Sequence, residues 1–379
     1  MKRMNILVLL VVISFNSIGN ELNKAIEAGL RTKVGMLLEK NIDINEVDEN
    51  DQTAINVAIL KRDEIIFDLI LNKNPDINKI NFKGQTALQL ARNTFDDHKN
   101  ALPTYKRVEI LENVVKIMSS QIDELTKLCA SEGGKPWLDS QVEVHRAING
   151  VKLAIEALGA REGKQIAMGH TASSANRMAY TFKEPIGVVA AISAFNHPLN
   201  LAIHQVIPAI TVGCSVVIKP ATQTPMSAIR VVEILEEAGL PKGWAQAVVC
   251  DRQGGELLAT SPKVNALTFI GSGAVGWYLN SKVAPGTRVA LEHGGVAPVI
   301  VEADADINEL IPSIGKGGFY HAGQVCVSVQ RVFVHESIVD EVASKLATYA
   351  SKLVVGDQLD PKTEVGPLIN HNEVNRVEE

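Results

Sequence analysis

The sequence lacks three features, each of which defines a class of protein. It has no excess of basic residues, because 43 acidic and 37 Lys or Arg residues give the 379-residue chain a net charge of −6. It has no apolar run long enough to span a bilayer. Its few cysteines are scattered without metal-ligand or disulfide-rich spacing: Cys129, Cys214, Cys250 and Cys326. We therefore expect no nucleic-acid binding, no membrane span and no metal site, and the cysteine usage favours a reducing compartment.

The first 19 residues nevertheless have the pattern of a secretory leader. Lys2 and Arg3 form a basic start, Ile6–Ile13 is a short apolar run, and Ser17–Gly19 offers small residues for cleavage. The alternative is a buried N-terminal strand or helix. We expect a signal-like leader at 1–19, which indicates export and conflicts with the cytoplasmic location expected of the remaining chain.

An internal repeat follows the leader. Asp43–Asn45 recurs 33 residues later as Asp76–Asn78, and Gln52–Ala54 recurs at the same offset as Gln85–Ala87. A period of 33 resembles the ankyrin repeat, in which each unit buries its apolar face against its neighbours. The sequence thus predicts an all-α, ankyrin-like segment at 20–95, with a possible protein partner. The alternative is two unrelated helical hairpins with similar turns.

From Pro103 onward the pattern changes to alternating helices and strands. Apolar residues at helical spacing predict helices at 105–128 and 142–158. Further helices are expected at 199–212 and 226–237. Five apolar strands are expected at 186–193, 215–218, 245–249, 264–270 and 288–291. Such alternation predicts an α/β fold with a doubly wound, mostly parallel sheet, in which ligands bind at the carboxyl ends of the strands.

Two stretches at predicted strand ends carry residues suited to chemistry. Gly271–Gly276 reads G-x-G-x-x-G after a strand, a turn that lets the backbone approach a pyrophosphate. Glu292 lies 21 residues beyond Gly271, so it fits either a ribose-binding acid or a general base. Cys326 stands in a turn that begins with Gly323, and it could be a nucleophile or an inert buried thiol.

Five short motifs in a fixed order indicate one family. They are Phe-Asn-His-Pro at 195–198, Val-Ile-Lys-Pro-Ala at 217–221, Phe-Ile-Gly-Ser at 269–272, Glu-His-Gly-Gly at 292–295 and Gly-Gln-Val-Cys at 323–326. Each is weak alone, but together they resemble the aldehyde dehydrogenases from about residue 102 to the end. The resemblance implies an NAD(P)-binding domain at 101–292, a hairpin with subunit contacts near 163–183, a catalytic domain at 293–379, and a homo-oligomer.

The resemblance also implies roles for single residues. Cys326 would attack an aldehyde, Glu292 would be the general base, and the Asn196 amide would hold the oxyanion. We favour the base role for Glu292 because the glycines that follow it leave the backbone accessible to a substrate or a cofactor ring. His293 is a departure from the family pattern, which usually has Leu at this position. The residues implied for cofactor binding are Lys219, Thr222, Gly271, Ser272 and Gly276. Many members carry Glu at the position of Thr222, and a neutral Thr leaves both NAD and NADP open.

Parts of the family pattern are missing. The ankyrin-like segment stands where strands of the cofactor domain are expected, and no Glu-Ile-Phe-Gly-Pro-type motif follows Ile369. We therefore expect a fragment truncated at both ends, the product of a fusion and a poor catalyst. The predicted function is NAD(P)-dependent oxidation of a small aldehyde to an acid through a cysteine thiohemiacetal and thioester. The alternative is an ankyrin-type protein-binding module with an inactive dehydrogenase fragment.

Overall fold

The computed structural model describes residues 21–40, 54, 91–92, 94–95, 102–160 and 163–378. The chain divides into two compact units, Met1–Leu90 and Ala91–Glu379. In the first unit, residues 21–27 are helical, and α2 (Arg31–Leu38) buries Val34 and Leu37. The signal-like leader at 1–19 and most of the ankyrin-like segment at 20–95 lie outside the described residues, so both stay predictions.

Three helices precede the main sheet in the second unit: α6 (Thr104–Ser120), α7 (Ile122–Gly133) and α8 (Trp137–Leu158). The single helix predicted at 105–128 is therefore wrong, because the chain breaks at Gln121, whose φ is −121°. Ser120 contributes to the break, since its hydroxyl donates to the carbonyl of Ile117 at 2.8 Å and competes with helical hydrogen bonding.

The main sheet has five strands: β3 (Val188–Ile192), β4 (Ser215–Lys219), β5 (Ala245–Ala247), β6 (Ala266–Gly271) and β7 (Arg288–His293). All neighbouring strands are parallel, in the order β5-β4-β3-β6-β7. The predicted doubly wound parallel sheet is thereby confirmed. The strand order reverses between β3 and β6, so a crevice for ligands is expected at the carboxyl ends of these two strands.

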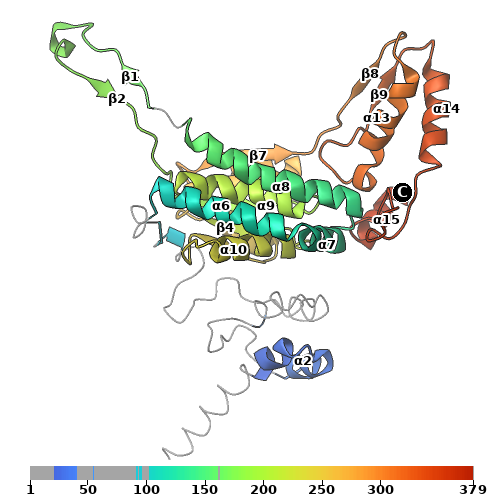
Figure 1. Ribbon diagram of the computed structural model, residues 1–379, viewed down its shortest axis with the longest axis horizontal. Coiled ribbons are helices and arrows are strands. Elements are labelled where there is room, and N and C mark those ends of the chain that lie inside the picture. The colour runs from blue at the N-terminus through green and yellow to red at the C-terminus, as the bar shows by residue number, and fades with distance from the viewer. Residues whose placement is uncertain are drawn as a thin grey trace, which may run out of the picture. The chain divides into compact units, whose positions relative to one another are not determined.

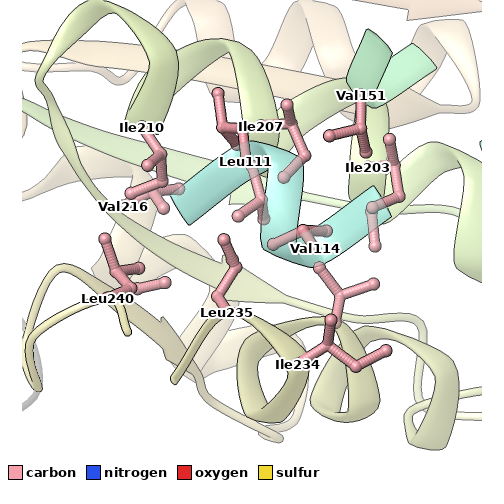
Figure 2. Packing of buried hydrophobic residues seen from close by; sticks show 14 of the residues in the cluster. Leu111, Val114, Val151, Ile203, Ile207, Ile210, Val216, Ile234, Leu235 and Leu240 are labelled. Carbon is pink, nitrogen blue, oxygen red and sulfur yellow. The ribbon is translucent and has the colours of Figure 1, made fainter. Parts of the chain in front are cut away.

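Four crossover helices connect the strands: α9 (Pro198–Val212), α10 (Met226–Glu237), α11 (Arg252–Thr260) and α12 (Gly273–Asn280). Because parallel crossovers are right-handed, α9 and α10 cover one face of the sheet, and α11 and α12 cover the other. Helices α6, α7 and α8 lie in front of α9 (Figure 1). Figure 2 shows the resulting core, a single cluster that contains Leu111 of α6, Ile207 of α9, Ile234 of α10 and Val216 of β4.

The remaining described elements form a hairpin and a smaller lobe. Strands β1 (Gln165–Ile166) and β2 (Ala179–Tyr180) pair antiparallel and extend away from the helices in Figure 1. The hairpin lies within the predicted range of 163–183. The smaller lobe contains β8 (Val299–Val301), β9 (Val332–Val334), α13 (Ile307–Phe319), η2 (Tyr320–Gly323), α14 (Val339–Ala350) and α15 (His371–Glu378). None of the helices in the described part of the chain is long and apolar enough to cross a membrane.

Candidate active site

A cavity of about 900 Å³ opens at the carboxyl ends of β3, β6 and β7, where the strand order predicts a ligand site. The turn before α9, the loop after η2, and residues of α8, α9, α12 and α15 also line the cavity. Five of the eight predicted site residues line this cavity: Asn196, Gly271, Ser272, Glu292 and Cys326. Segments separated by more than a hundred residues in the sequence therefore meet at one place.

The loop that carries Cys326 begins with a left-handed backbone. His321, Ala322 and Gly323 have φ values of 50°, 54° and 76°, a conformation in which only glycine is unstrained. Gln324 then fixes the loop to the end of the chain segment that precedes α15. Its side-chain amide donates to Pro367 O at 3.4 Å, and its Oε1 accepts from the Ile369 N–H at 2.9 Å.

Two hydrogen bonds join the cysteine loop to the other predicted catalytic segments. Asn196 Nδ2 donates to the Gln324 carbonyl at 2.9 Å, and the Gly295 N–H donates to the Cys326 carbonyl at 3.3 Å. Cys326 is partly exposed, and Glu292 is exposed at the end of β7. The thiol thus has access to the cavity, with an amide donor and a carboxylate among the groups that line the same space.

The backbone beside Asn196 is held by a buried ion pair that the sequence analysis did not single out. Lys135 and Glu143 pair with side chains 1% and 0% exposed. Lys135 Nζ also donates to the Asn196 carbonyl at 3.1 Å and lies 3.0 Å from His197 Nδ1. A sequence signal could have revealed this pair. Lys135 stands in a Gly-Lys-Pro run just before a helix, Glu143 lies eight residues further along, and a buried lysine needs an acidic partner.

Glu143 also fixes the start of α9. Its Oε1 accepts from the N–H groups of Leu199 and Asn200, both at 2.9 Å, so the carboxylate satisfies two unpaired donors at a helix N-terminus. Burial acts to raise the pKa of Glu143, but Lys135 and His197 outweigh it and hold the pKa well below its usual range. The group is therefore a permanent anion that sets the position of the Asn196 turn.

Gln205 joins the two strands at which the order reverses. Its Nε2 donates to the carbonyls of Ile192 in β3 and Thr268 in β6, both at 3.1 Å. The side chain is buried and lines the floor of the cavity. It therefore keeps β3 and β6 together at the point where the cavity opens.

The β6–α12 end of the cavity has groups that fit a dinucleotide. Gly271 and Ser272 line it, and Ser272 stands at the N-terminus of α12, where backbone N–H groups are free for an anion. The hydroxyl of Ser193 is buried, lines the same space and has no partner among the residues placed by the structure. An unpaired hydroxyl beside a glycine turn suits the ribose and pyrophosphate of a nucleotide.

The other three predicted cofactor residues lie outside the cavity lining. Lys219 Nζ donates to the Pro220 carbonyl at 2.9 Å, and burial lowers its pKa, although Cys250 and Asp251 oppose the shift. Thr222 is exposed after β4. Gly276 faces His293, whose Cε1 would lie 2.2 Å from an added Cβ. Their cofactor roles stay predictions, and packing alone accounts for glycine at 276.

Comparison with known proteins identifies the family. The sequence profile of the aldehyde dehydrogenase family matches residues 68–379. The chain belongs to this family. It is 41% identical over 285 residues to 3-sulfolactaldehyde dehydrogenase of Priestia megaterium, an alignment that covers 75% of this chain and 60% of that protein. It is 39% identical to lactaldehyde dehydrogenase of Methanocaldococcus jannaschii, an alignment that covers 71% of this chain and 58% of that protein.

Solved structures of the aldehyde dehydrogenase family agree with the fold. The NADP complex of glyceraldehyde-3-phosphate dehydrogenase GapN from Methanocaldococcus jannaschii has a TM-score of 0.73 and 37% identity, covering 77% of this chain and 63% of that one. An NAD+ complex of betaine aldehyde dehydrogenase from Staphylococcus aureus has the same TM-score at 29% identity. That match covers 77% of this chain and 59% of the relative. The chain therefore spans about three fifths of the length of these relatives.

Proposed function

We propose that the chain carries the site for NAD(P)-dependent oxidation of an aldehyde to a carboxylic acid. The observation that carries this proposal is that Cys326, Glu292 and Asn196 line one cavity together with the Gly271–Ser272 turn. A nucleophile, a base, an oxyanion donor and a nucleotide-binding turn are the groups this reaction requires.

In the proposed reaction, the Cys326 sulfur attacks the carbonyl carbon, and a carbon–sulfur bond forms as the carbonyl oxygen becomes an oxyanion. Asn196 Nδ2 has two N–H bonds and uses one for the Gln324 carbonyl, so the other is available to this oxygen. The Cys326 backbone N–H is the second donor. A bound nicotinamide would accept the hydride that leaves the carbon. The product on the enzyme is a thioester of Cys326.

Glu292 completes the cycle as the general base. Its carboxylate is exposed and makes no hydrogen bond or ion pair within the described part of the chain, so it is free to take a proton from the Cys326 thiol or from water. Water activated in this way adds to the thioester, the carbon–sulfur bond breaks, and the acid leaves with the thiolate restored. The exposed position also lets the carboxylate pass the proton to solvent.

The cofactor is NAD or NADP. Ser193, Ser272 and Lys219 would hold the nucleotide, and Thr222 would face the ribose without the negative charge that repels a 2′-phosphate. Solved relatives with NADP and with NAD+ support both options. By analogy with the names of its relatives, the substrate is a small oxygenated aldehyde. The β1–β2 hairpin would join copies of the chain into a homo-oligomer.

The first test is NAD(P)H formation by the full chain with lactaldehyde, succinate semialdehyde and glyceraldehyde 3-phosphate. Cys326→Ala should lower the rate by about three orders of magnitude or more, and Glu292→Gln by about two or more. Cys129→Ala is the matched thiol control, because Cys129 is buried in the core, and it should retain activity. A rate unaffected by Cys326→Ala, or no aldehyde-dependent NAD(P)H with any substrate, would contradict the proposal.

A further inference from the structure

Lys219 lies at the end of β4 without a carboxylate in contact. Its Nζ donates to the Pro220 carbonyl at 2.9 Å, and it makes no ion pair with any residue that the structure describes. Its stem packs against the start of α11, where a Cβ added at Gly255 would lie 3.1 Å from Lys219 Cδ and 3.3 Å from Cε. The side chain is only partly exposed. The amine has therefore lost much of its hydration and has gained only a neutral hydrogen-bond partner.

The groups around Lys219 do not supply the missing counter-charge. Asp251 is exposed, and its carboxylate caps α11 by accepting from the Gly254 N–H at 2.8 Å. Cys250 is 2% exposed, and burial raises its pKa to about 11, although Lys219 acts against this rise. The thiol is therefore neutral at physiological pH. The N-terminus of α11 is the positive end of the helix dipole, which disfavours an ammonium group beside it.

These surroundings favour the neutral form of the Lys219 amine. Burial lowers its pKa, and Cys250 and Asp251 oppose the shift only in part. A desolvated lysine in its neutral form is a nucleophile toward carbonyl carbons. Lys106 provides the contrast within the same chain: it is exposed, and its Nζ donates to Glu109 at 2.8 Å, which raises its pKa.

The position of Lys219 brings this amine close to the cavity. Ala221, two residues further along the chain, lines the cavity that also contains Cys326. Lys219 itself lies beside that lining, on the side where the nucleotide is proposed to bind. An aldehyde that reaches this part of the molecule therefore meets an amine as well as a thiol.

We propose that Lys219 is a second site at which an aldehyde binds covalently, as an imine of the side-chain amine. The neutral nitrogen attacks the carbonyl carbon, a carbon–nitrogen bond forms, and the proton lost from nitrogen passes to the oxygen. The resulting hydroxyl group then leaves as water, so the step needs no oxidant or reductant. The adduct would occupy the place assigned to the nucleotide, and excess aldehyde would slow nucleotide binding. This consequence rests on the proposed function, whereas the adduct itself does not.

The test traps the imine and needs no turnover. The full chain is treated with lactaldehyde and sodium cyanoborohydride in the absence of nucleotide, which converts each imine to a stable secondary amine. Peptide mass spectrometry then measures the labelling of each lysine over time. Near neutral pH, Lys219 should be labelled about fivefold or more faster than Lys106, although Lys106 is the more exposed residue. Labelling of Lys219 that is equal to or slower than that of Lys106 would overturn the proposal.

Two controls separate amine chemistry from accessibility. The ratio of Lys219 to Lys106 labelling should fall as the pH rises, because Lys106 also loses its proton in alkali, and measuring both in one sample cancels the pH dependence of the reagent. Glu109→Gln removes the acid partner of Lys106, so labelling of Lys106 should rise and labelling of Lys219 should not change. A ratio that is constant with pH would contradict the role of the neutral amine.

Competition with the nucleotide tests the consequence. Cys326→Ala keeps Lys219 and prevents oxidation, so NADP+ can be present during labelling. At about ten times its dissociation constant, NADP+ should slow labelling of Lys219 about tenfold and leave Lys106 unchanged. Unchanged labelling of Lys219 would overturn the competition. Labelling of Lys219 without NAD(P)H formation by the wild-type chain would support the imine site and reject the oxidation, so the two failures are distinguishable.

Discussion

His321 combines a left-handed backbone with a buried imidazole in the loop that leads to Cys326. Its φ is 50°, and neither ring nitrogen has a hydrogen-bond partner among the described residues. Burial, followed by the positive charges of Lys135 and His197, lowers the pKa of His321 to about 3. The ring is therefore neutral at physiological pH, and a proton on it would be buried without a counter-charge.

The folded state should lose stability in acid because of this ring. An unfolded histidine titrates near pH 6.5, so the stability contributed by neutral His321 is present above that pH and is lost as the pH falls toward 3. Between pH 7.5 and 5 the loss should be about 2 kcal/mol. His321→Asn tolerates the left-handed backbone and should lack this loss. Urea unfolding at both pH values measures it, and equal losses in the two proteins would contradict the assignment.

The meeting of Asn196, Glu292 and Cys326 at one cavity could be predicted from sequence because each belongs to a local motif. Asn196 follows strand β3, Glu292 lies near the end of strand β7, and Cys326 follows a glycine turn, all places where short sequence patterns are informative. The Lys135–Glu143 pair could not be predicted in the same way. Its burial depends on the packing of α8 against α9, and helical periodicity does not reveal which charged residue a neighbouring helix will cover.

At the scale of elements, α12 packs on β7 through a glycine. An added Cβ at Gly276 would lie 2.2 Å from His293 Cε1 and 3.1 Å from Phe269 Cδ1. The His293 ring lies between Phe269 and Trp277, with centroid distances of 6.3 and 5.9 Å, and its two nitrogens have no partner within the described chain. The imidazole thus serves as a packing group against the glycine face of the helix.

Gly276→Ala should therefore destabilise the protein by about 1–3 kcal/mol, the usual cost of overpacking. His293→Ala removes the obstructing ring, so the double variant should recover most of the loss that Gly276→Ala causes alone. Gly273→Ala is the control, because its added Cβ would lie 3.9 Å from the same ring and should change little. Chemical denaturation provides the comparison, and additive effects of the two substitutions would contradict this contact.

One helix and one strand end could not be predicted from local residue propensities. Helix α11 was not predicted, because Gly254 and Gly255 lower helix propensity. The structure forms it nonetheless: Asp251 caps it by accepting from the Gly254 N–H at 2.8 Å, and Leu258 and Ala259 are buried. The expected strand at 245–249 ends at Ala247 instead. The parallel direction of the strands, by contrast, follows from the β-α-β alternation in the sequence.

At the scale of the whole molecule, the hairpin presents apolar side chains to solvent. Phe182 is 84% exposed, Met178 79% and Tyr180 53%, although large apolar groups normally avoid such exposure in clusters. The two strands are only two residues long each and are themselves exposed. This surface is suited to burial against another copy of the chain.

Replacing Met178 and Phe182 together by Glu should lower the molecular mass in solution to that of a smaller assembly. The fold should survive, because both side chains are exposed. Leu257→Glu is the control: Leu257 is an exposed apolar residue on α11 and should leave the assembly unchanged. Light scattering coupled to gel filtration measures the mass. An unchanged mass in the double variant would show that the hairpin does not carry subunit contacts.

The outer edge of β7 has no strand partner in the part of the chain that the structure describes. Its exposed residues alternate along the strand as Arg288, Ala290 and Glu292, which is a cation, a neutral residue and an anion. Charged side chains on an edge strand discourage pairing with the edge of another sheet. The repulsion between like charges at this edge weakens as the salt concentration rises.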